Sequence, residues 1–365
     1  MLSLASAAVH AGWALQWDAA RAVPNVRSGE DVPHACSVVV CCRNEAHQLE
    51  AFRRGLAPAL ARWEREGRTV EVVAVDDGST DGTFEHLQAI AATDARWRPV
   101  RLAASRPGKK DALTLGMARA AHPVRVLLDA DCRPAHEAWL LHMTRGAERA
   151  WDVNVGIGWP EPRTGASGKP LLNALQRIEA ERLAQRAVGA VRGGRPYLAF
   201  GRNLAVTQQA WAQTTGMENH AHLPSGDDDL WLQEAHLGGA RVRDCVHPEA
   251  HTVSRWPETW TAWRVQKTRH FTASPAYPWR TKVWLALPIL AWWGLVAGVV
   301  HNPGGTSLGC MALAVAIRTL TFGQFLRQTG QPGRGAWRLL LEPLVSAFRG
   351  WAWCQGQTSD PKPWK

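Results

Sequence analysis

Short apolar runs alternate with helical patterns along the first third of the chain. The apolar runs are rich in β-branched residues and predict strands at 37–41, 70–75, 100–102 and 124–128. Helical patterns fill the gaps between them at 46–66, 83–92 and 112–121. Strands separated by helices predict a βαβα order and therefore an α/β fold, with a mainly parallel sheet that helices cover on both faces.

Later segments extend this alternation with less regular patterns. Their composition and spacing predict a loop at 156–169, a helix at 171–188, a strand at 197–200 and a helix at 229–237. Pro58 falls inside the first helical pattern, where a proline removes a backbone hydrogen bond, so we expect it to kink or split that helix.

The chain is most apolar towards its C-terminus, where two stretches have the composition of membrane spans. Val283 to Val300 contains no charged residue, and about 18 apolar residues are the lower limit for crossing a hydrocarbon core of ~30 Å. Leu308 to Leu326 is also mostly apolar, but it can cross only if Arg318 faces a protein partner or reaches the interface. We therefore predict membrane helices. The alternative is a hydrophobic helical hairpin that packs on the rest of the protein.

The charges around these stretches predict an orientation. The loop at 301–307 has no lysine or arginine, whereas Arg280, Lys282 and Arg327 flank the outer ends. Because basic residues accumulate on the cytoplasmic side, we expect attachment to the inner (cytoplasmic) membrane, with the main domain facing the cytoplasm. Residues 1–17 are uncharged apart from neutral His10 and lack a basic start, which argues against a cleaved signal peptide and leaves a short anchor or an amphipathic helix as the alternatives.

Composition adds one broad expectation and one exclusion. Lysine and arginine total 42 against 32 aspartate and glutamate residues, and the net charge of +10 favours anionic partners such as phosphates, nucleic acid or acidic lipids. The 7 cysteines show no Cys-x-x-Cys spacing, so a zinc site or thiol redox motif is not expected. We divide the chain into an N-terminal segment, a main domain and a membrane-associated tail at residues 1–35, 36–275 and 276–365.

Carboxylates stand at the ends of two predicted strands. Asp76 and Asp77 close the second strand, and Asp129 and Asp131 follow the fourth. The carboxyl ends of parallel strands form the crevice where ligands bind in open α/β sheets. Asp129 and Asp131 point the same way, as two ligands of one metal must, and Mg²⁺ commonly bridges carboxylate to phosphate. These ends predict a site for Mg²⁺ or Mn²⁺ and a nucleoside diphosphate, with Asp76 and Asp77 at the nucleotide.

Two lysines precede the helical pattern at 112–121. Gly108-Lys109-Lys110 stands where backbone amides, the helix dipole and an ammonium group together attract phosphate. In contrast, Asp81 and Thr83 are placed to cap a helix, and we assign them that structural role.

Three consecutive aspartates precede the last predicted helix. Asp227, Asp228 and Asp229 repel one another unless a cationic or protic group compensates them. Asp229 is placed to cap the helix, which leaves Asp227 or Asp228 to act as a general base. Further on, residues 266–270 offer the guanidinium of Arg269 to a diphosphate, and the alternative for this stretch is a basic surface that faces the membrane.

Together these segments resemble the family 2 glycosyltransferases with the GT-A fold, in particular the membrane-attached bacterial members related to processive β-glycan synthases. The matching segments run in order from about residue 36 to residue 273. Ser37-Val38-Val39-Val40 with Arg43-Asn44-Glu45 resembles the first nucleotide-binding strand and loop, and Val75-Asp76-Asp77-Gly78-Ser79 resembles the segment that contacts uridine. The resemblance implies that the donor nucleotide is bound by Arg43, Glu45, Asp76, Asp77, Lys109, Lys110 and Asp129.

The same resemblance implies the remaining roles. Asp129-Ala130-Asp131 matches the metal-binding Asp-x-Asp motif, and Gly226-Asp227-Asp228 resembles the motif whose last aspartate is the base, which implies Asp228 with Asp227 as its reserve. Phe200-Gly201-Arg202-Asn203 resembles a stretch near the acceptor, and Gln266-Lys267-Thr268-Arg269-His270 resembles the Gln-x-x-Arg-Trp signature. The residues implied at the diphosphate or acceptor are Asn203, Gln266, Arg269 and His270.

Two features set the chain apart from the large synthases. His270 replaces the tryptophan that helps to bind the acceptor sugar, and two candidate spans are too few for a channel that conducts a polymer. The resemblance therefore implies a non-processive, inverting enzyme. It moves a sugar from a nucleotide sugar, in the first place a UDP-sugar, to a lipid-linked or glycan acceptor at the membrane, without a nucleic-acid partner.

Two other functions stay open. A sugar-phosphate nucleotidyltransferase also places acidic metal ligands on a nucleotide-binding sheet, but such enzymes usually begin with a Gly-rich basic loop, and Arg43-Asn44-Glu45 follows the first strand here. A non-catalytic membrane scaffold of the same fold would not need the complete acidic set of Asp76, Asp77, Asp129, Asp131 and Asp228.

Overall fold

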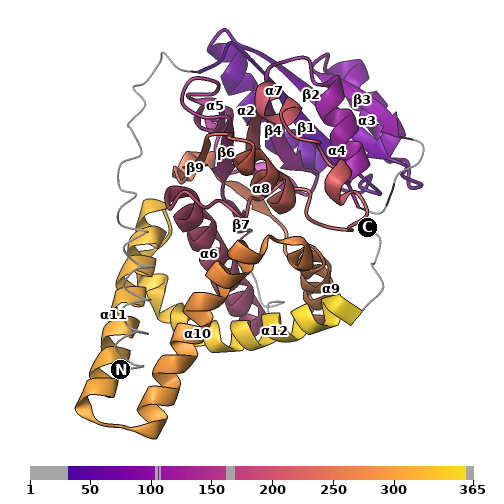
Figure 1. Ribbon diagram of the computed structural model, residues 1–365. Helices are drawn as coiled ribbons and strands as arrows, with labels where there is room; N and C mark the ends of the chain where they lie inside the picture. The colour runs from indigo at the N-terminus through magenta and orange to yellow at the C-terminus, as the bar shows by residue number, and fades with distance from the viewer. Residues whose placement is uncertain (1–31, 103–105, 107, 162–168, 359–365) are drawn as a thin grey trace.

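The computed structural model describes residues 32–102, 106, 108–161 and 169–358. The anchor expected at residues 1–17 lies outside these ranges. In Figure 1 the sheet and its covering helices form one body, and two long C-terminal helices project from that body as a hairpin.

A seven-stranded sheet forms the centre of the body. Its parallel part consists of β1 (Ala35–Cys42), β2 (Thr69–Asp77), β3 (Trp97–Leu102) and β4 (Val124–Asp129). It continues with β8 (Leu204–Thr207), which is antiparallel to β4, and with β6 (Val153–Gly156) and β9 (Val242–Cys245). The strand order is β3-β2-β1-β4-β8-β6-β9, so β1 lies between β2 and β4. The expected mainly parallel sheet is confirmed.

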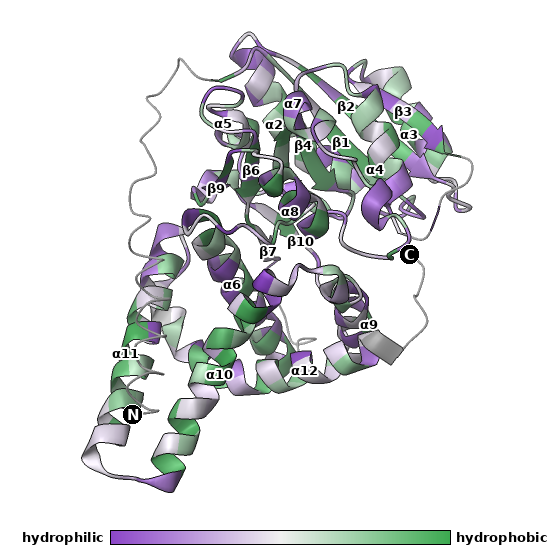
Figure 2. Ribbon diagram, in the orientation of Figure 1, coloured by the Kyte–Doolittle hydropathy of each residue, from purple (hydrophilic) through white to green (hydrophobic). Residues whose placement is uncertain are grey.

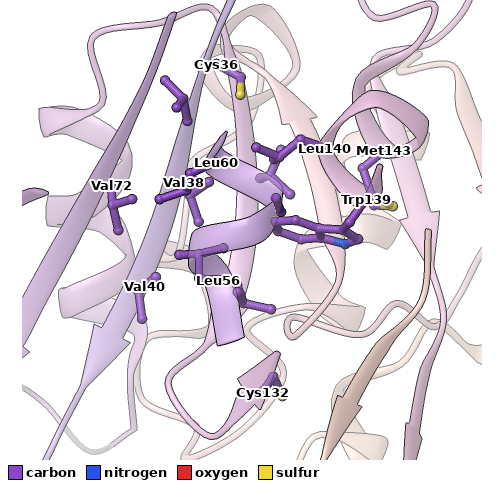
Figure 3. Packing of buried hydrophobic residues seen from close by; sticks show 14 of the residues in the cluster. Cys36, Val38, Val40, Leu56, Leu60, Val72, Cys132, Trp139, Leu140 and Met143 are labelled. Carbon is purple, nitrogen blue, oxygen red and sulfur yellow. The ribbon is translucent and has the colours of Figure 1, made fainter. Parts of the chain in front are cut away.

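Helices cover both faces of this sheet. One face carries α2 (Leu49–Arg65), α3 (Thr83–Thr93) and α5 (Trp139–Thr144), and the other carries α4 (Lys110–Arg119) and α8 (Asp229–Leu237). Val38 and Val40 of β1 belong to the core that contains Leu56 and Leu60 of α2 (Figure 3), whereas Val39 belongs to the core on the opposite face. A strand that is buried on both faces needs apolar residues at every position, which explains the unbroken apolar runs in the sequence.

Two predictions about these elements need correction. Pro58 does not split the helix: α2 runs unbroken from Leu49 to Arg65, because apolar side chains on both sides of the proline are buried against the sheet. The loop expected at 156–169 contains β7 (Gly158–Pro160). This strand joins a second, three-stranded sheet with β10 (Thr252–Ser254) and β5 (Cys132–Pro134).

The strand expected at 197–200 is wrong. These four residues are all described and form no strand, and β8 begins only at Leu204. The backbone turns in between, where the N–H of Asn203 donates to the carbonyl of Phe200 over 2.8 Å. The apolar residues of this segment serve another purpose, since the ring of Tyr197 packs on that of Trp284 in the C-terminal tail.

Helices make up most of the C-terminal half. The long ones are α6 (Pro170–Arg192), α9 (Trp260–Phe271), α10 (Trp279–His301), α11 (Gly305–Gln328) and α12 (Glu342–Thr358). Short ones are α7 (Gln208–Ala212), η1 (Glu218–His220), η2 (Pro248–Ala250), η3 (Ser274–Ala276) and η4 (Gly333–Leu341). By length and composition α10 and α11 are able to cross a membrane, and Figure 2 shows hydrophobic residues along both.

The last turns of α11 belong to the core of the body. Phe322, Phe325 and Leu326 are fully buried and share a core with Leu172 and Ile178 of α6. Large apolar side chains elsewhere on the two helices are exposed, among them those of Leu290, Trp293, Leu313 and Leu320. The tail therefore combines both expectations, because one end packs on the body and the rest presents an apolar surface.

Candidate active site

The aspartates at the strand ends meet at one edge of the sheet. Asp76 pairs in register with Cys42 of β1, and Asp129 pairs with Cys41 on the other side of the same strand. Because neighbouring strands lie about 4.8 Å apart, the two acidic strand ends are separated by roughly 10 Å across β1. The two acidic ends therefore lie in one region at the edge of the sheet, where the sequence predicts the ligand crevice.

Asp76 and Asp77 are buried and hold basic partners. Asp76 pairs in register with Arg101 of β3, whose Nε lies 3.6 Å from Asp76 Oδ2. Asp77 Oδ2 accepts a hydrogen bond from Arg43 Nη1 over 3.3 Å. The N–H of Ser79 approaches Asp76 Oδ1 at 3.4 Å. This end of the crevice is therefore built from two carboxylates, each beside a guanidinium.

The loop after β1 is tied to the loop after β2. Asn44 adopts a φ of 55°, in the left-handed region that asparagine tolerates, and its N–H donates to Ser79 Oγ over 2.9 Å. The N–H of Glu45 donates to Thr83 Oγ1 over 2.8 Å. Asp81 Oδ1 accepts the N–H of Thr83 over 3.1 Å, so both side chains are engaged in the structure of this loop. The cap expected of them is wrong, because Gly82 is the N-cap of α3 and Thr83 is already helical.

Lys109 connects the end of β4, which carries Asp129, to the acidic run, which is our name for the three consecutive aspartates at 227–229. Its Nζ lies 2.9 Å from Asp129 Oδ1 and 3.0 Å from Asp227 Oδ2. Burial alone would lower the pKa of Lys109, but the charges of Asp129 and Asp227 outweigh burial and raise that pKa well above its ordinary value. The absence of a side chain at Gly201 leaves room for this ammonium group, because a Cβ there would lie only 3.0 Å from Lys109 Nζ.

Asp228, and not Asp229, caps α8. Asp228 Oδ1 accepts the N–H of Asp229 over 2.9 Å, and its Oδ2 accepts the N–H of Gly201 over 2.9 Å. The cap expected at Asp229 is wrong because that residue is already helical and buried. Its carboxylate accepts the N–H of Leu230 over 2.8 Å and the hydroxyl of Tyr277.

The three aspartates differ in acidity. Burial and the charges of Asp227 and Asp229 raise the pKa of Asp228 to about 8, against the opposing charge of Lys109. Burial is also the main cause that raises the pKa of Asp229 to about 6. Burial would raise the pKa of Asp227 too, but Lys109 outweighs it and lowers that pKa. Asp228 is the member whose proton affinity suits a base near neutral pH.

Asp129 and Asp131 fit a hard divalent cation. The ligand atoms of Asp129, Asp131 and Cys132 all lie within 4.8 Å of one another. Burial holds the pKa of Cys132 well above its ordinary value, so its thiol keeps its proton and donates to Asp131 Oδ1 over 3.3 Å. The donors left for a cation are carboxylate oxygens, which Mg²⁺ and Mn²⁺ prefer.

Residues 37–193 match the family model described as Glycosyl transferase family 2. This match covers β1, the two acidic strand ends and Lys109 in the order expected from the sequence. The chain therefore contains a family 2 glycosyltransferase domain.

Solved structures resemble this glycosyltransferase in fold. One is the mannosyltransferase PcManGT from Pyrobaculum calidifontis in complex with GDP-Man and Mn²⁺, with a TM-score of 0.55, 17% identity, and coverage of 94% of this chain and 98% of that chain. Another is TarS 1–349 from S. aureus in complex with UDP-GlcNAc, with a TM-score of 0.43, 16% identity, and coverage of 89% and 90%. The first similarity shows a shared GT-A fold, and the fold alone. No curated protein matches the chain.

Two residues that the sequence places among the ligands of the glycosyltransferase have their polar atoms engaged elsewhere. Lys110 is buried, and its Nζ donates to the carbonyls of His220, Leu223 and Ser225. Asn203 is also buried: its Oδ1 accepts from Trp139 Nε1, and its Nδ2 donates to the carbonyls of Ile157 and Ala250. Both side chains hold the site's scaffold together, and we withdraw them as ligands.

Gln266, Arg269 and His270 lie on α9, which runs towards the acidic run. Ser225 Oγ and Thr272 Oγ1 are 2.9 Å apart and link the two segments. Gln266 and Arg269 are half-buried and His270 is exposed. Lys267, between them, is buried, and its Nζ lies 2.8 Å from Glu179 Oε2. The basic residues of this helix are therefore not all exposed.

Some residues of the glycosyltransferase site were not anticipated from the sequence. The sequence does carry a signal for Arg101: this residue alternates with apolar residues in a predicted strand, and that strand pairs with the one that bears Asp76. No sequence signal points to Tyr277 or to the N–H of Gly201, because each contacts the acidic run from a segment far away in the chain.

Proposed function

We propose that this glycosyltransferase moves a sugar from a nucleotide-sugar donor to a lipid-linked or glycan acceptor at a membrane, with inversion at the anomeric carbon and with Asp228 as general base. The observation that best supports this proposal is the environment of the Asp228 carboxylate. This carboxylate is held by the N–H of Gly201, lies beside the Lys109–Asp227 pair, and has a pKa raised to about 8.

Each acidic strand end has its own part in this reaction. Asp76 and Asp77, with Arg43 and Arg101 beside them, line the end of the crevice assigned to the nucleotide. Asp129 and Asp131 would hold Mg²⁺ or Mn²⁺, which supplies charge stabilisation to a departing diphosphate. The GDP-Man and Mn²⁺ complex of the mannosyltransferase with the same fold supports a nucleotide sugar and a divalent cation as ligands.

The chain's own residues then perform the transfer. Asp228 takes the proton of the acceptor hydroxyl while the acceptor oxygen forms a bond to the anomeric carbon and the bond to the diphosphate breaks. A single displacement from the face opposite to the leaving group inverts the anomeric centre. Lys109 is fixed between Asp129 and Asp227, and it places a positive charge at the centre of the site, where negative charge develops.

The tail and the division of the chain complete the proposal. We propose that the two apolar helices attach the protein to the inner (cytoplasmic) membrane, and the basic residues at their outer ends support a cytoplasmic location of the catalytic domain. We assign residues 36–275 to the catalytic domain and residues 276–365 to the membrane-associated tail. Of the residues on α9, Arg269 is assigned to the diphosphate, and Gln266 and His270 are assigned to the acceptor.

The decisive experiment compares Asp228→Asn with the wild-type full-length protein in detergent. A panel of UDP- and GDP-sugars with Mn²⁺ first identifies the donor by calorimetry. We expect Asp228→Asn to lower transfer by about 100-fold or more, because a positioned base commonly contributes 10²–10⁴, and to leave donor affinity unchanged.

Asp131→Asn is the matched control, because we expect it to lose metal-dependent donor binding as well as transfer. Full transfer by Asp228→Asn would refute the base assignment. Release of pyrophosphate from a nucleoside triphosphate and a sugar phosphate would select a nucleotidyltransferase instead, and failure to bind any nucleotide sugar would favour a scaffold.

A further inference from the structure

The projecting hairpin of α10 and α11 is held to the body by a polar junction part-way along both helices. Arg318 of α11 donates to Glu342 at the start of α12, and its guanidinium lies 4.6 Å from the ring of Trp292 of α10. Glu342 also lies 3.1 Å from Arg182 and 3.4 Å from Arg186, both of α6. We call Arg182, Arg186, Arg318 and Glu342 the collar.

The collar lies part-way along the two arms of the hairpin, α10 and α11, and we call the residues between it and the tip the free part. On the body side of the collar, Leu290 and Leu320 are exposed as well. Beyond Arg318, towards the tip, α11 contributes residues 305–317, which rise about 20 Å. Beyond Trp292, α10 contributes residues 293–301, which rise about 14 Å. A hydrocarbon core is ~30 Å thick, so the free part of the hairpin matches the depth of about one leaflet.

The free part has an apolar outside and its own small core. Leu295, Cys310 and Ala314 are buried between the two arms. The side chains of Trp293 and Leu313 are exposed by 64% and 56%. In the view of Figures 1 and 2 this part extends below α12. Its packing therefore joins the arms to each other and leaves their outer surface to an apolar medium.

The tip satisfies many of its own polar groups. The N–H of Asn302 donates to Gly298 O over 3.0 Å, and Asn302 Oδ1 accepts the N–H of Gly304 over 3.3 Å. Ser307 Oγ donates to Gly304 O over 3.0 Å, and Pro303 has no N–H to satisfy. Unsatisfied backbone groups are costly in hydrocarbon, so an uncharged and internally bonded turn suits the interior of a bilayer.

The collar has a net positive charge, which suits contact with lipid headgroups. Three arginines share the single carboxylate of Glu342 and leave an excess of positive charge at the depth where the hairpin leaves the body. Burial would raise the pKa of Glu342, but the surrounding arginines outweigh it and lower that pKa to about 2. The excess positive charge of the collar is complementary to anionic phospholipids.

We propose that the α10–α11 hairpin enters one leaflet of an anionic bilayer as a re-entrant hairpin and does not cross it. The collar then lies at the headgroups, and the tip turns inside the hydrocarbon. If the hairpin crossed the bilayer, the charged collar would lie inside the hydrocarbon. With the collar at the headgroups, the free part is too short to reach the far surface. This inference rests on the proposed membrane attachment but is independent of the chemistry at Asp228.

The test places a fluorescent nitrobenzoxadiazole label at the tip. Gly305→Cys is suitable because a Cβ at this position meets nothing within 4 Å, and Cys354→Ser removes the exposed native thiol. Full-length protein is added to vesicles of phosphatidylcholine and phosphatidylglycerol in a 3:1 ratio that contain nitroxide lipids of known depth. Glu85→Cys on α3, in the same background, is the aqueous control.

We expect the label at residue 305 to be quenched most strongly by nitroxides near the ends of the acyl chains. We also expect it to resist dithionite supplied outside or trapped inside the vesicles, whereas the label at residue 85 is reduced by external dithionite. Reduction of the tip label only by trapped dithionite would show two complete spans and overturn the proposal. Reduction only from outside, without quenching by lipid, would show that a second copy or water covers the hairpin, and would overturn it too.

Matched leucine substitutions test the membrane contact itself. Leu313→Glu puts a charge on the free part of the hairpin, and Leu237→Glu puts one on an exposed site of α8, so neither substitution disturbs a buried position. We expect Leu313→Glu to lower the vesicle-bound fraction by about tenfold or more and Leu237→Glu to leave it unchanged. If wild-type protein does not bind vesicles, both the membrane attachment and this inference fail, and the assay of transfer in detergent still reports separately on the proposed reaction.

Discussion

At the scale of single residues, the site separates three adjacent aspartates by their surroundings. Asp227 is held ionised by Lys109, Asp229 is hydrogen-bonded to Tyr277, and Asp228 is left with the highest proton affinity of the three. Adjacent carboxylates cannot all ionise freely in a buried place, so neighbouring charges set which one holds a proton. The same chemistry predicts how the enzyme responds to pH.

Transfer activity should rise with pH through the pKa of Asp228, about 8, because the base must lose its proton before it can accept another. Asp227→Asn removes a like charge that raises this pKa. We therefore expect the acid limb of the pH–rate profile to move to lower pH in Asp227→Asn, measured as kcat against pH at saturating donor. A limb that stays in place, or moves to higher pH, would contradict the assignment.

Gly201→Ala should impair transfer more than stability. The added Cβ would lie 3.0 Å from Lys109 Nζ, and the end of the lysine side chain has to shift away from Asp129 and Asp227. We expect about a tenfold loss of kcat/KM, since displacement of a positioned group by a fraction of an ångström is costly, with Tm nearly unchanged. Gly350→Ala, at a position with nothing within 4 Å, is the control and should retain full activity.

At the scale of secondary-structure elements, buried polar side chains connect segments that the sequence leaves unrelated. Asn203 follows the turn before β8 and bonds to Trp139 of α5, to Ile157 and to Ala250 of η2. Lys110 ties the start of α4 to the loop that leads into the acidic run. These bonds position Asp228 and the Asp129–Asp131 pair, the base and the metal ligands that we propose, relative to each other.

Asn203→Ala should therefore lower stability and leave donor contacts intact. The substitution strands one indole N–H and two carbonyls in a buried place, which we expect to lower the free energy of unfolding by about 3 kcal/mol. Urea unfolding measures this loss, and calorimetry with donor and Mn²⁺ below the unfolding range measures binding. A large loss of donor affinity in folded protein would restore Asn203 as a ligand.

At the scale of the whole molecule, the tail is part of the folded body as well as the membrane attachment that we propose. Phe322, Phe325 and Leu326 of α11 and Val345 of α12 complete the core under α6. The collar and this core both join residues of the tail to α6, so insertion of the hairpin, as we propose it, would be mechanically linked to the orientation of the catalytic domain.

A chain that ends at Pro278 should for this reason not fold stably. Loss of four fully buried large side chains removes about 6 kcal/mol or more of hydrophobic stabilisation, which is comparable to the stability of a typical domain. We expect low soluble yield and a Tm lowered by at least 10 °C. The control is the full chain with Leu320→Ser, which changes an exposed position of α11 and should keep its Tm. Normal folding of the truncated chain would show that the tail is a separate unit.

The sequence alone determines the alternating strands and helices, and with them the parallel sheet. Apolar periodicity is a local property, and a strand buried on both faces, such as β1, can be recognised from its own residues. The positions of Asp76, Asp77, Asp129 and Asp131 follow from the same logic, because the ends of parallel strands meet at one edge. The helix at 229–237 was also placed correctly, and only its cap was assigned to the wrong aspartate.

Only the tertiary structure determined which hydrogen-bond or ion-pair partner each polar side chain has. Lys109 and Lys110 are adjacent in sequence, yet Lys109 lies beside two carboxylates and Lys110 donates to three backbone carbonyls. In the same way, Asp228 acquires its high pKa from burial and neighbouring charges, and Arg318 acquires a partner in Glu342 from a different helix. Such contacts depend on how distant segments pack, and no local pattern in the sequence records them.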